Sequence, residues 1–199
     1  MKKLLSVTFS LLICIFLFAS CGADNDDGIR QESTATAEEN IQQPDNDTSV
    51  FGVFITKDMD GNEVTQQIFA ENKLTMVNIW ATFCGPCINE MPALGELAEE
   101  YKNKGVAIVG IPVDITDDNG VIYDKLYNKA TQIIAETNAD YVHIVPSAVM
   151  CERKLSSVYS VPETIFVDSQ GNQVGQVYMG ARSKEQWAAI IDGLLGEMQ

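Results

Sequence analysis

Short apolar runs and segments with helical periodicity alternate along most of the chain. The residues around Val53–Ile55 and around Val64 are typical of strands, and the turn sequence Asp58–Asn62 between them predicts a β-hairpin. Leu74–Ile79 and Val106–Ile115 are continuous apolar runs, as in strands that are buried on both faces. The pattern therefore predicts an N-terminal hairpin and two central strands.

Two helices are indicated by apolar residues that recur every three or four positions. The first extends from Pro86 to about Lys104 and ends at Gly105. The second is marked by Ile122, Leu126, Ala130, Ile133 and Ile134.

The remaining elements are short. Tyr141–Val145 is typical of a strand and Ser147–Tyr159 of a short helix. Thr164–Val167 and Gln173–Tyr178 are strands joined by the hairpin turn Asp168–Asn172.

The last helix begins at Ser183, with Gln186 three residues later as a capping box. Strand and helix alternate first, and a hairpin and a helix follow, so we expect an α/β domain with a mixed sheet flanked by helices over residues 50–199. The expected buried face of the last helix consists of Trp187, Ile190, Ile191, Leu194, Leu195 and Met198.

Residues 1–20 have the pattern of a signal peptide. A basic start precedes the apolar stretch Leu4–Ala19, which is shorter than the roughly 20 residues of a spanning helix. Small residues stand directly before Cys21, which resembles a bacterial lipobox, although Phe18 replaces the usual Leu. The resemblance implies a lipid on Cys21 and loss of Cys14 with the leader; a plain signal peptide or an uncleaved anchor are the alternatives.

Residues 21–49 are expected to form a disordered acidic tether. The segment has no aromatic residue, and Arg30 is its single base among many acids. Such a segment cannot bury enough apolar surface to offset its ordering entropy. As a flexible coil it would reach about 30 Å, lifting a domain off a membrane; a leader without function is the alternative.

Composition limits the partners of the chain. Its 199 residues suit one domain with an appendage, and 46% hydrophobic residues suffice for a core. Its 28 acidic and 13 basic residues give a net charge of −15, which disfavours nucleic acid as a partner. The chain has five Cys, and export would place those that remain after loss of the leader where disulfides persist.

The candidate chemistry is the pair Cys84 and Cys87, at the junction of an apolar strand and a helix. At a helix N-terminus, free N–H groups and the dipole favour the thiolate of Cys84, which is the form that attacks disulfides. Pro86 suits the first helical turn, and Gly85 leaves space beside the sulfur. Cys87, one turn later, can then resolve a mixed disulfide.

Two motifs resemble the thioredoxin superfamily, and its TlpA/ResA-like branch in particular. The first is Trp80–Pro92, with Cys-Gly-Pro-Cys followed by Glu90 and Pro92 in the arrangement C-x-x-C-x-x-E-x-P. The second, Val161–Asp168, is similar to the family's cis-proline strand. The resemblance covers about Phe54 to Leu195 and implies a thioredoxin-like fold with an N-terminal hairpin extension.

The resemblance also implies roles. Cys84 would be the nucleophile, Cys87 the resolving Cys and Glu90 the acid that adjusts the proton balance of the pair. Pro162 would be cis and pack against the sulfurs, and Val161 would offer backbone groups to an extended substrate. The implied substrate surface consists of Trp80, Phe83, Gly85, Pro86 and Val161.

Two positions depart from the family pattern. Typical thioredoxins have a buried Asp six residues before the first Cys, where this chain has Asn78. Asn cannot take a proton from Cys87, so the proton role would fall to Glu90. Phe83 replaces a frequent Trp and keeps an apolar rim without the N–H.

The resemblance implies an extracytoplasmic protein-disulfide reductase, anchored to a bacterial membrane and expected to be a monomer. Gly-Pro between the Cys accompanies reducing members. Electrons would come from a membrane thiol transporter of the CcdA or DsbD kind and go to exported clients of the apocytochrome c or methionine sulfoxide reductase type. No bound cofactor is implied. A disulfide oxidase or isomerase, and a redox-inert binding module, remain alternatives.

Other interpretations of these residues stay open. Cys84, Cys87, His143 and Cys151 could supply four zinc ligands at unusual spacing, and a purely structural disulfide is also conceivable. We expect no metal, Cys151 as a buried apolar residue and His143 as a structural histidine. The acids at Asp114, Asp117 and Asp118 are expected in a solvated loop rather than a cation site, and Glu90 could be a solvated helix residue.

Overall fold

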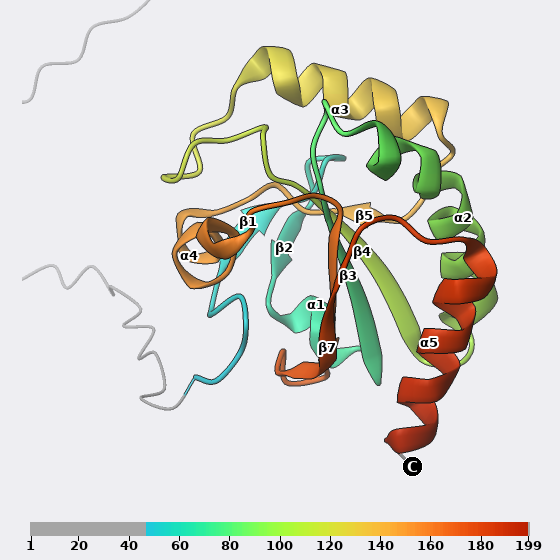
Figure 1. Cartoon of the computed structure of the whole chain (residues 1–199). Coiled ribbons are helices and arrows are strands. Elements are labelled where there is room, and N and C mark those ends of the chain that lie inside the picture. Colours follow the sequence, from blue (N-terminus) through green and yellow to red (C-terminus); the bar gives the residue numbers. More distant parts are fainter. Residues whose placement is uncertain (1–46, 199) are drawn as a thin grey trace, which may run out of the picture. The chain divides into compact units, whose positions relative to one another are not determined.

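A five-stranded sheet organises residues 47–198, the part of the chain that this computed structural model describes (Figure 1). In spatial order the strands are β5 (Val142–His143), β4 (Val106–Pro112), β3 (Leu74–Trp80), β6 (Glu163–Asp168) and β7 (Gln173–Met179). β3 pairs in parallel with β4, and β4 with β5, whereas β6 runs antiparallel to β3 and to β7. The predicted mixed sheet is confirmed.

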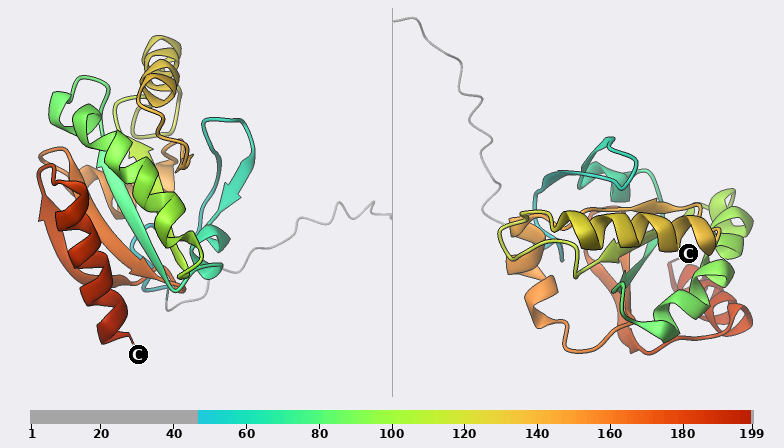
Figure 2. Two further views of the ribbon diagram at one scale, coloured as in Figure 1. Left: turned by 90° about the vertical axis from the view of Figure 1, so that its right-hand side faces the viewer. Right: turned by 90° about the horizontal axis from the view of Figure 1, so that it is seen from above.

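Helices α2 (Gly85–Lys102) and α5 (Lys184–Glu197) lie side by side over one face of the sheet (Figure 2). Leu74 and Met76 of β3 point to this face and pack among residues of both helices, including Leu94 and Trp187. The capping box predicted at Ser183 is present and begins α5.

The opposite face is covered by the N-terminal hairpin and short helices. These are β1 (Ile55–Lys57), β2 (Glu63–Thr65), α1 (Gln67–Ala70) and α4 (Ala148–Arg153), followed by a 3-10 turn at Leu155–Ser157. Val77 and Ile79 of β3 point to this side because neighbouring strand residues face opposite ways, and they share a core with Phe54 and Met150.

Helix α3 (Asp124–Glu136) connects β4 to β5 and completes the domain. Ala130 and Ile133 on its buried face join a third apolar cluster with Trp80 and Met91. This cluster includes both Cys of the candidate site, so α3 supports the site from the side of β5.

Several elements are shorter than the sequence predicts. β4 ends at Pro112, β5 has only two residues, and the helix expected over Ser147–Tyr159 stops at Arg153. Lys154 has a non-helical backbone, and its side chain pairs with Glu163 instead. Two residues differ from their expected places. Ile122, expected in the second helix, precedes α3 and is exposed, and Met198, expected on the buried face of the last helix, is exposed. The short helix α1 was not predicted.

The predicted signal peptide and the lipidation site Cys21 lie outside the described residues, as does the tether except for its last three residues. Asp47 and Ser49 contact the domain through Arg153, whose guanidinium donates to both backbone carbonyls at 2.9 Å. Within residues 47–198, no helix is long and apolar enough to cross a membrane.

Candidate active site

Cys84 and Cys87 lie where β3 gives way to α2. Cys84 is the N-cap of α2, and Pro86 occupies the first helical turn, where its missing N–H leaves no bond unmade. The two Cys form a disulfide. The backbone N–H of Cys87 points at Cys84 Sγ across 3.2 Å, so the helix terminus directs a donor at this sulfur.

The two sulfurs differ in access. Cys84 is 6% exposed and Cys87 is fully buried, so only Cys84 can meet a protein substrate directly. A Cβ at Gly85 would meet nothing within 4 Å, which leaves open space beside the pair as expected. Phe83 is 74% exposed next to Cys84 and forms the apolar rim.

A second loop faces the disulfide from the start of β6. The peptide bond between Val161 and Pro162 is cis, as predicted, and Pro162 is buried. The backbone carbonyl oxygen of Val161 lies 3.5 Å from Cys84 Sγ. Main-chain groups of Val161 therefore stand beside the sulfur that a substrate would approach.

Glu90 is buried beneath the Cys pair rather than solvated. Its Oε1 accepts a hydrogen bond from Asn78 Nδ2 at 2.9 Å. Its Oε2 accepts from the backbone N–H of Arg182 at 3.0 Å and from Trp187 Nε1 at 3.2 Å. The carboxylate thus has a donor for each oxygen, and it lies one helical turn after Cys87 on the same helix face.

Burial raises the pKa of Glu90 above its usual range, because desolvation penalises the charged form. The three hydrogen bonds and the nearby Arg182 charge act in the opposite direction. Sequence reasoning did not find Arg182 and Trp187 as partners of Glu90. Both residues lie more than 90 positions after Glu90, and no sequence motif connects them to it.

Trp80 corrects one expectation. The sequence predicts that it both supports the core and belongs to the substrate-facing rim, but its side chain has no exposed surface, so only the core role is confirmed. It lies in the same apolar cluster as both Cys and supports them from below. Of the expected rim, Phe83, Gly85 and Pro86 are exposed and Val161 is partly exposed.

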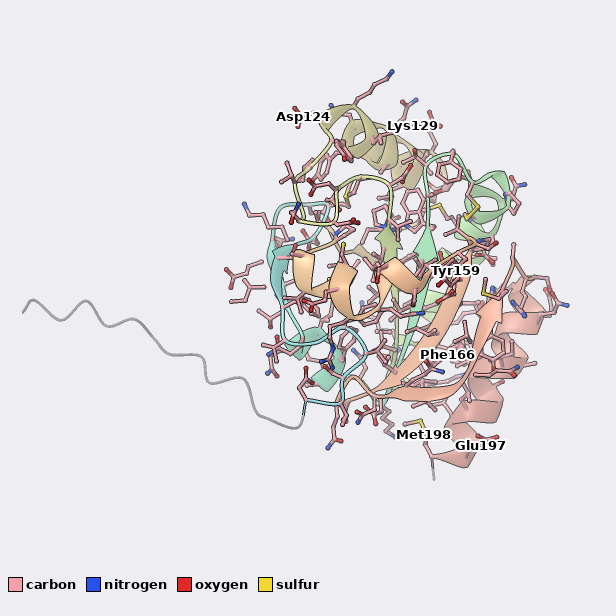
Figure 3. All side chains as sticks on the ribbon, turned by 60° about the vertical axis from the view of Figure 1, so that its left-hand side comes forward. Asp124, Lys129, Tyr159, Phe166, Glu197 and Met198 are labelled. Atoms are coloured by element: carbon pink, nitrogen blue, oxygen red, sulfur yellow. A yellow bond between two sulfur atoms is a disulfide. The ribbon has the colours of Figure 1, made fainter. Side chains whose placement is uncertain are left out.

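An apolar groove of about 380 Å³ adjoins the disulfide. Tyr159, labelled in Figure 3, is 93% exposed and stands at its edge. Lys154 and Glu163, both largely buried, form an ion pair that ties the 3-10 turn to the start of β6. The groove is lined by Phe83, Val113, Leu155, Val158, Tyr159, Ser160 and Val161.

The remaining thiol and the histidine lie elsewhere. Cys151 is unpaired among the described residues, buried in the core, and burial raises its pKa. His143 is buried beside Trp80 and Tyr141, with ring centroids 5.8 and 4.4 Å away. Between residues 47 and 198, no cluster of three or more His, Cys, Asp or Glu side chains could hold a metal ion.

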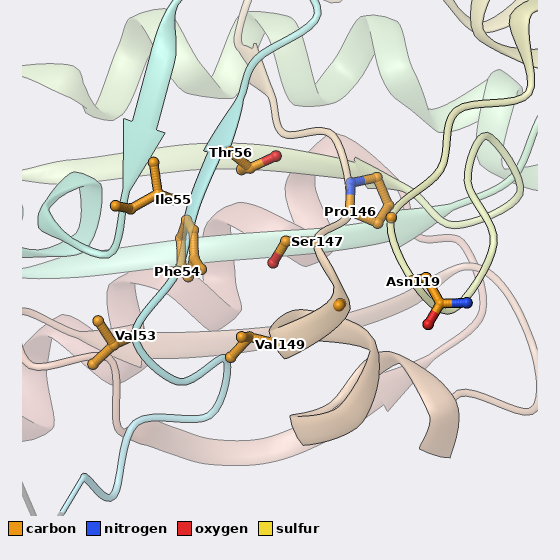
Figure 4. Close-up of a pocket in the computed structure, with 10 residues that line it drawn as sticks. Val53, Phe54, Ile55, Thr56, Asn119, Pro146, Ser147 and Val149 are labelled. Atoms are coloured by element: carbon orange, nitrogen blue, oxygen red, sulfur yellow. The ribbon is translucent and has the colours of Figure 1, made fainter. Parts of the chain in front are cut away.

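A different pocket, of about 390 Å³, lies between the N-terminal hairpin and the start of α4 (Figure 4). Ser147, Asn119 and Thr56 are its polar members, and none of its lining side chains is an acid, a base or a thiol. It therefore offers no group for redox or proton chemistry, and the candidate active site remains the Cys84–Cys87 disulfide.

Comparison with known proteins identifies the family. The Redoxin profile matches residues 39–189. The chain belongs to the Redoxin family. The thiol-disulfide oxidoreductase ResA of Bacillus thuringiensis is 27% identical over 133 residues, covering 67% of this chain and 69% of the relative. The thiol:disulfide interchange protein DsbE of Pseudomonas fluorescens is 31% identical over 137 residues, covering 69% of this chain and 68% of the relative.

Solved structures show the same fold for this Redoxin-family chain. A thiol:disulfide interchange protein of Chlorobium tepidum superposes with a TM-score of 0.58 at 19% identity, covering 76% of this chain and 99% of that protein. One from Bacteroides sp. gives 0.55 at 23% identity, covering 75% and 90%. The predicted thioredoxin-like fold is confirmed, and the chain is a thiol–disulfide oxidoreductase of the ResA/DsbE type with the pair Cys84–Cys87.

Proposed function

We propose that this Redoxin-family chain is an extracytoplasmic reductase of protein disulfides, tethered to a bacterial membrane. The observation that carries the proposal is the disulfide at the N-terminus of α2, with Cys84 accessible and the Val161 carbonyl 3.5 Å from its sulfur. An accessible sulfur beside free main-chain groups suits attack on an extended segment of another protein.

The catalytic cycle begins with the reduced pair. The Cys84 thiolate attacks a client disulfide, a new bond joins Cys84 to one client sulfur, and the other client sulfur leaves as a thiolate and takes up a proton. Cys87 then loses its proton and attacks Cys84 Sγ, which releases the second client thiol. The client gains two electrons, and the enzyme is left with the disulfide that joins Cys84 and Cys87.

Glu90 is the proposed acceptor for the Cys87 proton. It is buried, it lies one helical turn away, and burial raises its pKa, which makes its carboxylate a stronger proton acceptor. Asn78, which stands where related proteins have an acid, cannot serve this purpose. Glu90 is thus a proton-transfer group, whereas Pro162 shapes the opposite wall.

The client surface is proposed to be the exposed rim together with the neighbouring groove. Phe83 and Tyr159 present large, exposed apolar faces on the groove next to Cys84. Burial of large apolar side chains of this kind contributes much of the binding free energy in protein–protein interfaces. Gly85, Pro86 and Val161 supply the surface immediately next to the sulfur.

Reduction of insulin by the purified full chain tests the enzymatic proposal. We expect turnover with a dithiol donor, complete loss in Cys84→Ser, and retained turnover in Cys151→Ser, which removes a buried thiol outside the pair. Absence of Cys84-dependent turnover would refute the proposal and favour a redox-inert binding module. A reduction potential near −270 mV supports a reductase, whereas one near −120 mV would indicate an oxidase.

Membrane attachment is proposed through a lipid on Cys21, with residues 22–49 as the spacer. The proposal rests on the apolar leader and the small residues before Cys21. Labelling of cells with radioactive palmitate should mark the full chain and the Cys14→Ser variant but not Cys21→Ser. Equal labelling of both variants would contradict a lipid at Cys21.

The proposed partners follow from this location. A membrane thiol transporter of the CcdA or DsbD kind would re-reduce the pair, and clients would be exported proteins of the apocytochrome c or methionine sulfoxide reductase type. The chain itself is proposed to act as a monomer without bound cofactor, since the two Cys carry both electrons.

A further inference from the structure

Four polar atoms beneath helix α2 are buried without a hydrogen-bond partner in the described part of the chain. Two are donors, the Trp80 Nε1–H and the Tyr141 hydroxyl, and two are Asn78 Oδ1 and His143 Nδ1. A buried polar atom without a partner costs about 1–3 kcal/mol. The presence of four such atoms close together in the region of Glu90 therefore requires an explanation.

The sheet register places Asn78 and His143 in one row. Asn78 of β3 pairs with Gly110 of β4, and Gly110 pairs with His143 of β5. Paired residues of neighbouring strands point to the same face of a sheet. The side chains of Asn78 and His143 therefore face α2 together, separated only by a residue without a side chain.

Gly110 lets the imidazole occupy that gap. A Cβ built at position 110 would overlap His143 Nδ1, with the ring atoms Cε1 and Cγ next nearest. The Nδ1 edge of the ring thus lies directly over Gly110, on the side toward Asn78. The opposite nitrogen, Nε2, lies 3.2 Å from the backbone carbonyl oxygen of Ala139.

This contact fixes the protonation of the ring. A carbonyl oxygen only accepts, so Nε2 carries the proton and donates to Ala139. Burial lowers the pKa of His143 to about 4, so the ring is neutral near pH 7 and Nδ1 is an acceptor.

Asn78 presents a second acceptor. Its Nδ2 donates to Glu90 Oε1 at 2.9 Å and to Thr164 Oγ1 at 3.1 Å. This assignment of the amide follows from the carboxylate of Glu90, which can only accept when ionised. Its Oδ1 is consequently left without a donor, as is His143 Nδ1 across Gly110.

Two acceptors cannot bond to each other, but one water can donate to both. A buried water is stable where it has two to four polar partners, and the Tyr141 hydroxyl is a further donor or acceptor nearby. The Tyr141 ring lies 4.4 Å from the His143 ring, so its hydroxyl belongs to the same buried region.

We propose that His143 is a positioning residue for Glu90, acting through a buried water and Asn78. The water donates to His143 Nδ1 and to Asn78 Oδ1, which holds the amide with its Nδ2 toward the carboxylate. The inference rests on the proton role of Glu90 in the proposed function, and it explains why an Asn and a Gly stand at these two strand positions.

The groups around Glu90 determine how the inference is tested. Arg182 and Trp187 face it from the segment that begins α5, Asn78 and Thr164 from the sheet, and Tyr141 from beside β5. Cys87 is the titratable group on its own helix. In the oxidised protein the disulfide does not titrate, and Tyr141 has a pKa above its ordinary value of 10, so the Glu90 carboxyl can be followed without thiol interference.

Two variants of His143 separate the proposed role from a structural one. In His143→Asn, the amide places a possible acceptor at the same number of bonds from Cα as Nδ1 but loses the contact with Ala139. In His143→Gln, the amide can still donate to Ala139 but places no acceptor at the Nδ1 position. The measurement is the Glu90 pKa, from carbon NMR of the side-chain carboxyl in the oxidised full chain.

We expect His143→Gln to raise the Glu90 pKa by about one unit, because an Asn78 amide that has lost the restraint on its Oδ1 makes a weaker hydrogen bond to the charged carboxylate. His143→Asn should leave the pKa near the wild-type value. The opposite order, or no change in His143→Gln, would overturn the inference. If the Gln variant does not fold, a high-resolution crystal structure of the wild type decides by the presence or absence of a water between Nδ1 and Oδ1.

The outcome is separable from the proposed function. Absence of Cys84-dependent insulin reduction would refute the function while the Glu90 titration stays readable. An unchanged titration with full Cys84-dependent turnover would refute only the role of His143.

Discussion

Trp187 Nε1 donates to Glu90 Oε2 at 3.2 Å, which ties the first turn of α5 to the acid beneath the Cys pair. The backbone N–H of Arg182 donates to the same oxygen, so this carboxylate oxygen is bound entirely by a segment at the end of the chain. Glu90 of α2 is thus held in place by residues at the start of α5, the last helix along the described chain. Its environment, rather than the Cys motif alone, determines its pKa.

Glu90→Gln is expected to change the pH dependence of reduction. The wild-type rate should rise as pH increases through the raised Glu90 pKa, since only the carboxylate accepts the Cys87 proton. In the variant this rise should be absent and the rate about 100-fold lower. Measuring kcat/KM for insulin between pH 4 and 9 tests this, and an identical profile would refute the proton role.

The same variant has a stability signature. A carboxyl whose folded pKa is raised contributes stability that is present below its unfolded pKa and is lost as pH rises through the folded value. Glu90→Gln removes this loss, and Gln retains the size and one acceptor for Trp187 and Arg182. Unfolding free energies of the oxidised wild type should therefore fall above pH 4.5 relative to those of the variant. A constant difference between them would contradict the raised pKa.

Cys87→Ser should trap clients on the enzyme. The first attack needs only Cys84, which is the accessible sulfur, whereas release needs the buried Cys87. The variant should therefore accumulate mixed disulfides in cells, visible as dithiothreitol-sensitive bands by non-reducing electrophoresis. Cys84→Ser is the matched control and should trap none; the reverse pattern would exchange the roles of the two Cys.

The sequence predicts the sheet, the main helices and the Cys pair because each has a local signature. The apolar runs of β3 and β4, the periodicity of α2 and the capping box at Ser183 depend only on neighbouring residues. The Cys-Gly-Pro-Cys motif likewise carries its geometry within one strand–helix junction.

The environment of Glu90 was beyond prediction because it depends on tertiary contacts. The partners come from two segments far apart in the chain, Asn78 from β3 and Arg182 and Trp187 from the start of α5, and no periodicity relates them to Glu90. The placement of Trp80 failed for a similar reason: a residue at the end of a strand can face the core or the rim, and only the packing of α2 and α3 over the sheet decides this.

Phe83→Ala and Tyr159→Ala are expected to impair reduction of proteins but not of small disulfides. Each side chain is largely exposed beside the groove, so truncation removes apolar area that a docked protein would bury. We expect kcat/KM for insulin to fall about tenfold for each variant, with the rate for hydroxyethyl disulfide unchanged. Ile55→Ala, at an exposed apolar position on the N-terminal hairpin, serves as the control. A similar loss in the control, or a loss with the small disulfide, would contradict a docking role.

Gly110→Ala should destabilise the domain, although alanine suits a strand better than glycine does. The added Cβ would overlap His143 Nδ1, and moving the ring would disturb its contacts with Trp80, Tyr141 and the Ala139 carbonyl. We expect a loss of about 3 kcal/mol in the free energy of unfolding, as in an overpacked core. Gly193→Ala is the matched control, because its Cβ would meet nothing within 4 Å and alanine favours the helix by about 0.5–1 kcal/mol. Urea denaturation measures both, and a Gly110→Ala variant as stable as the wild type would show that the imidazole does not lie over this strand position.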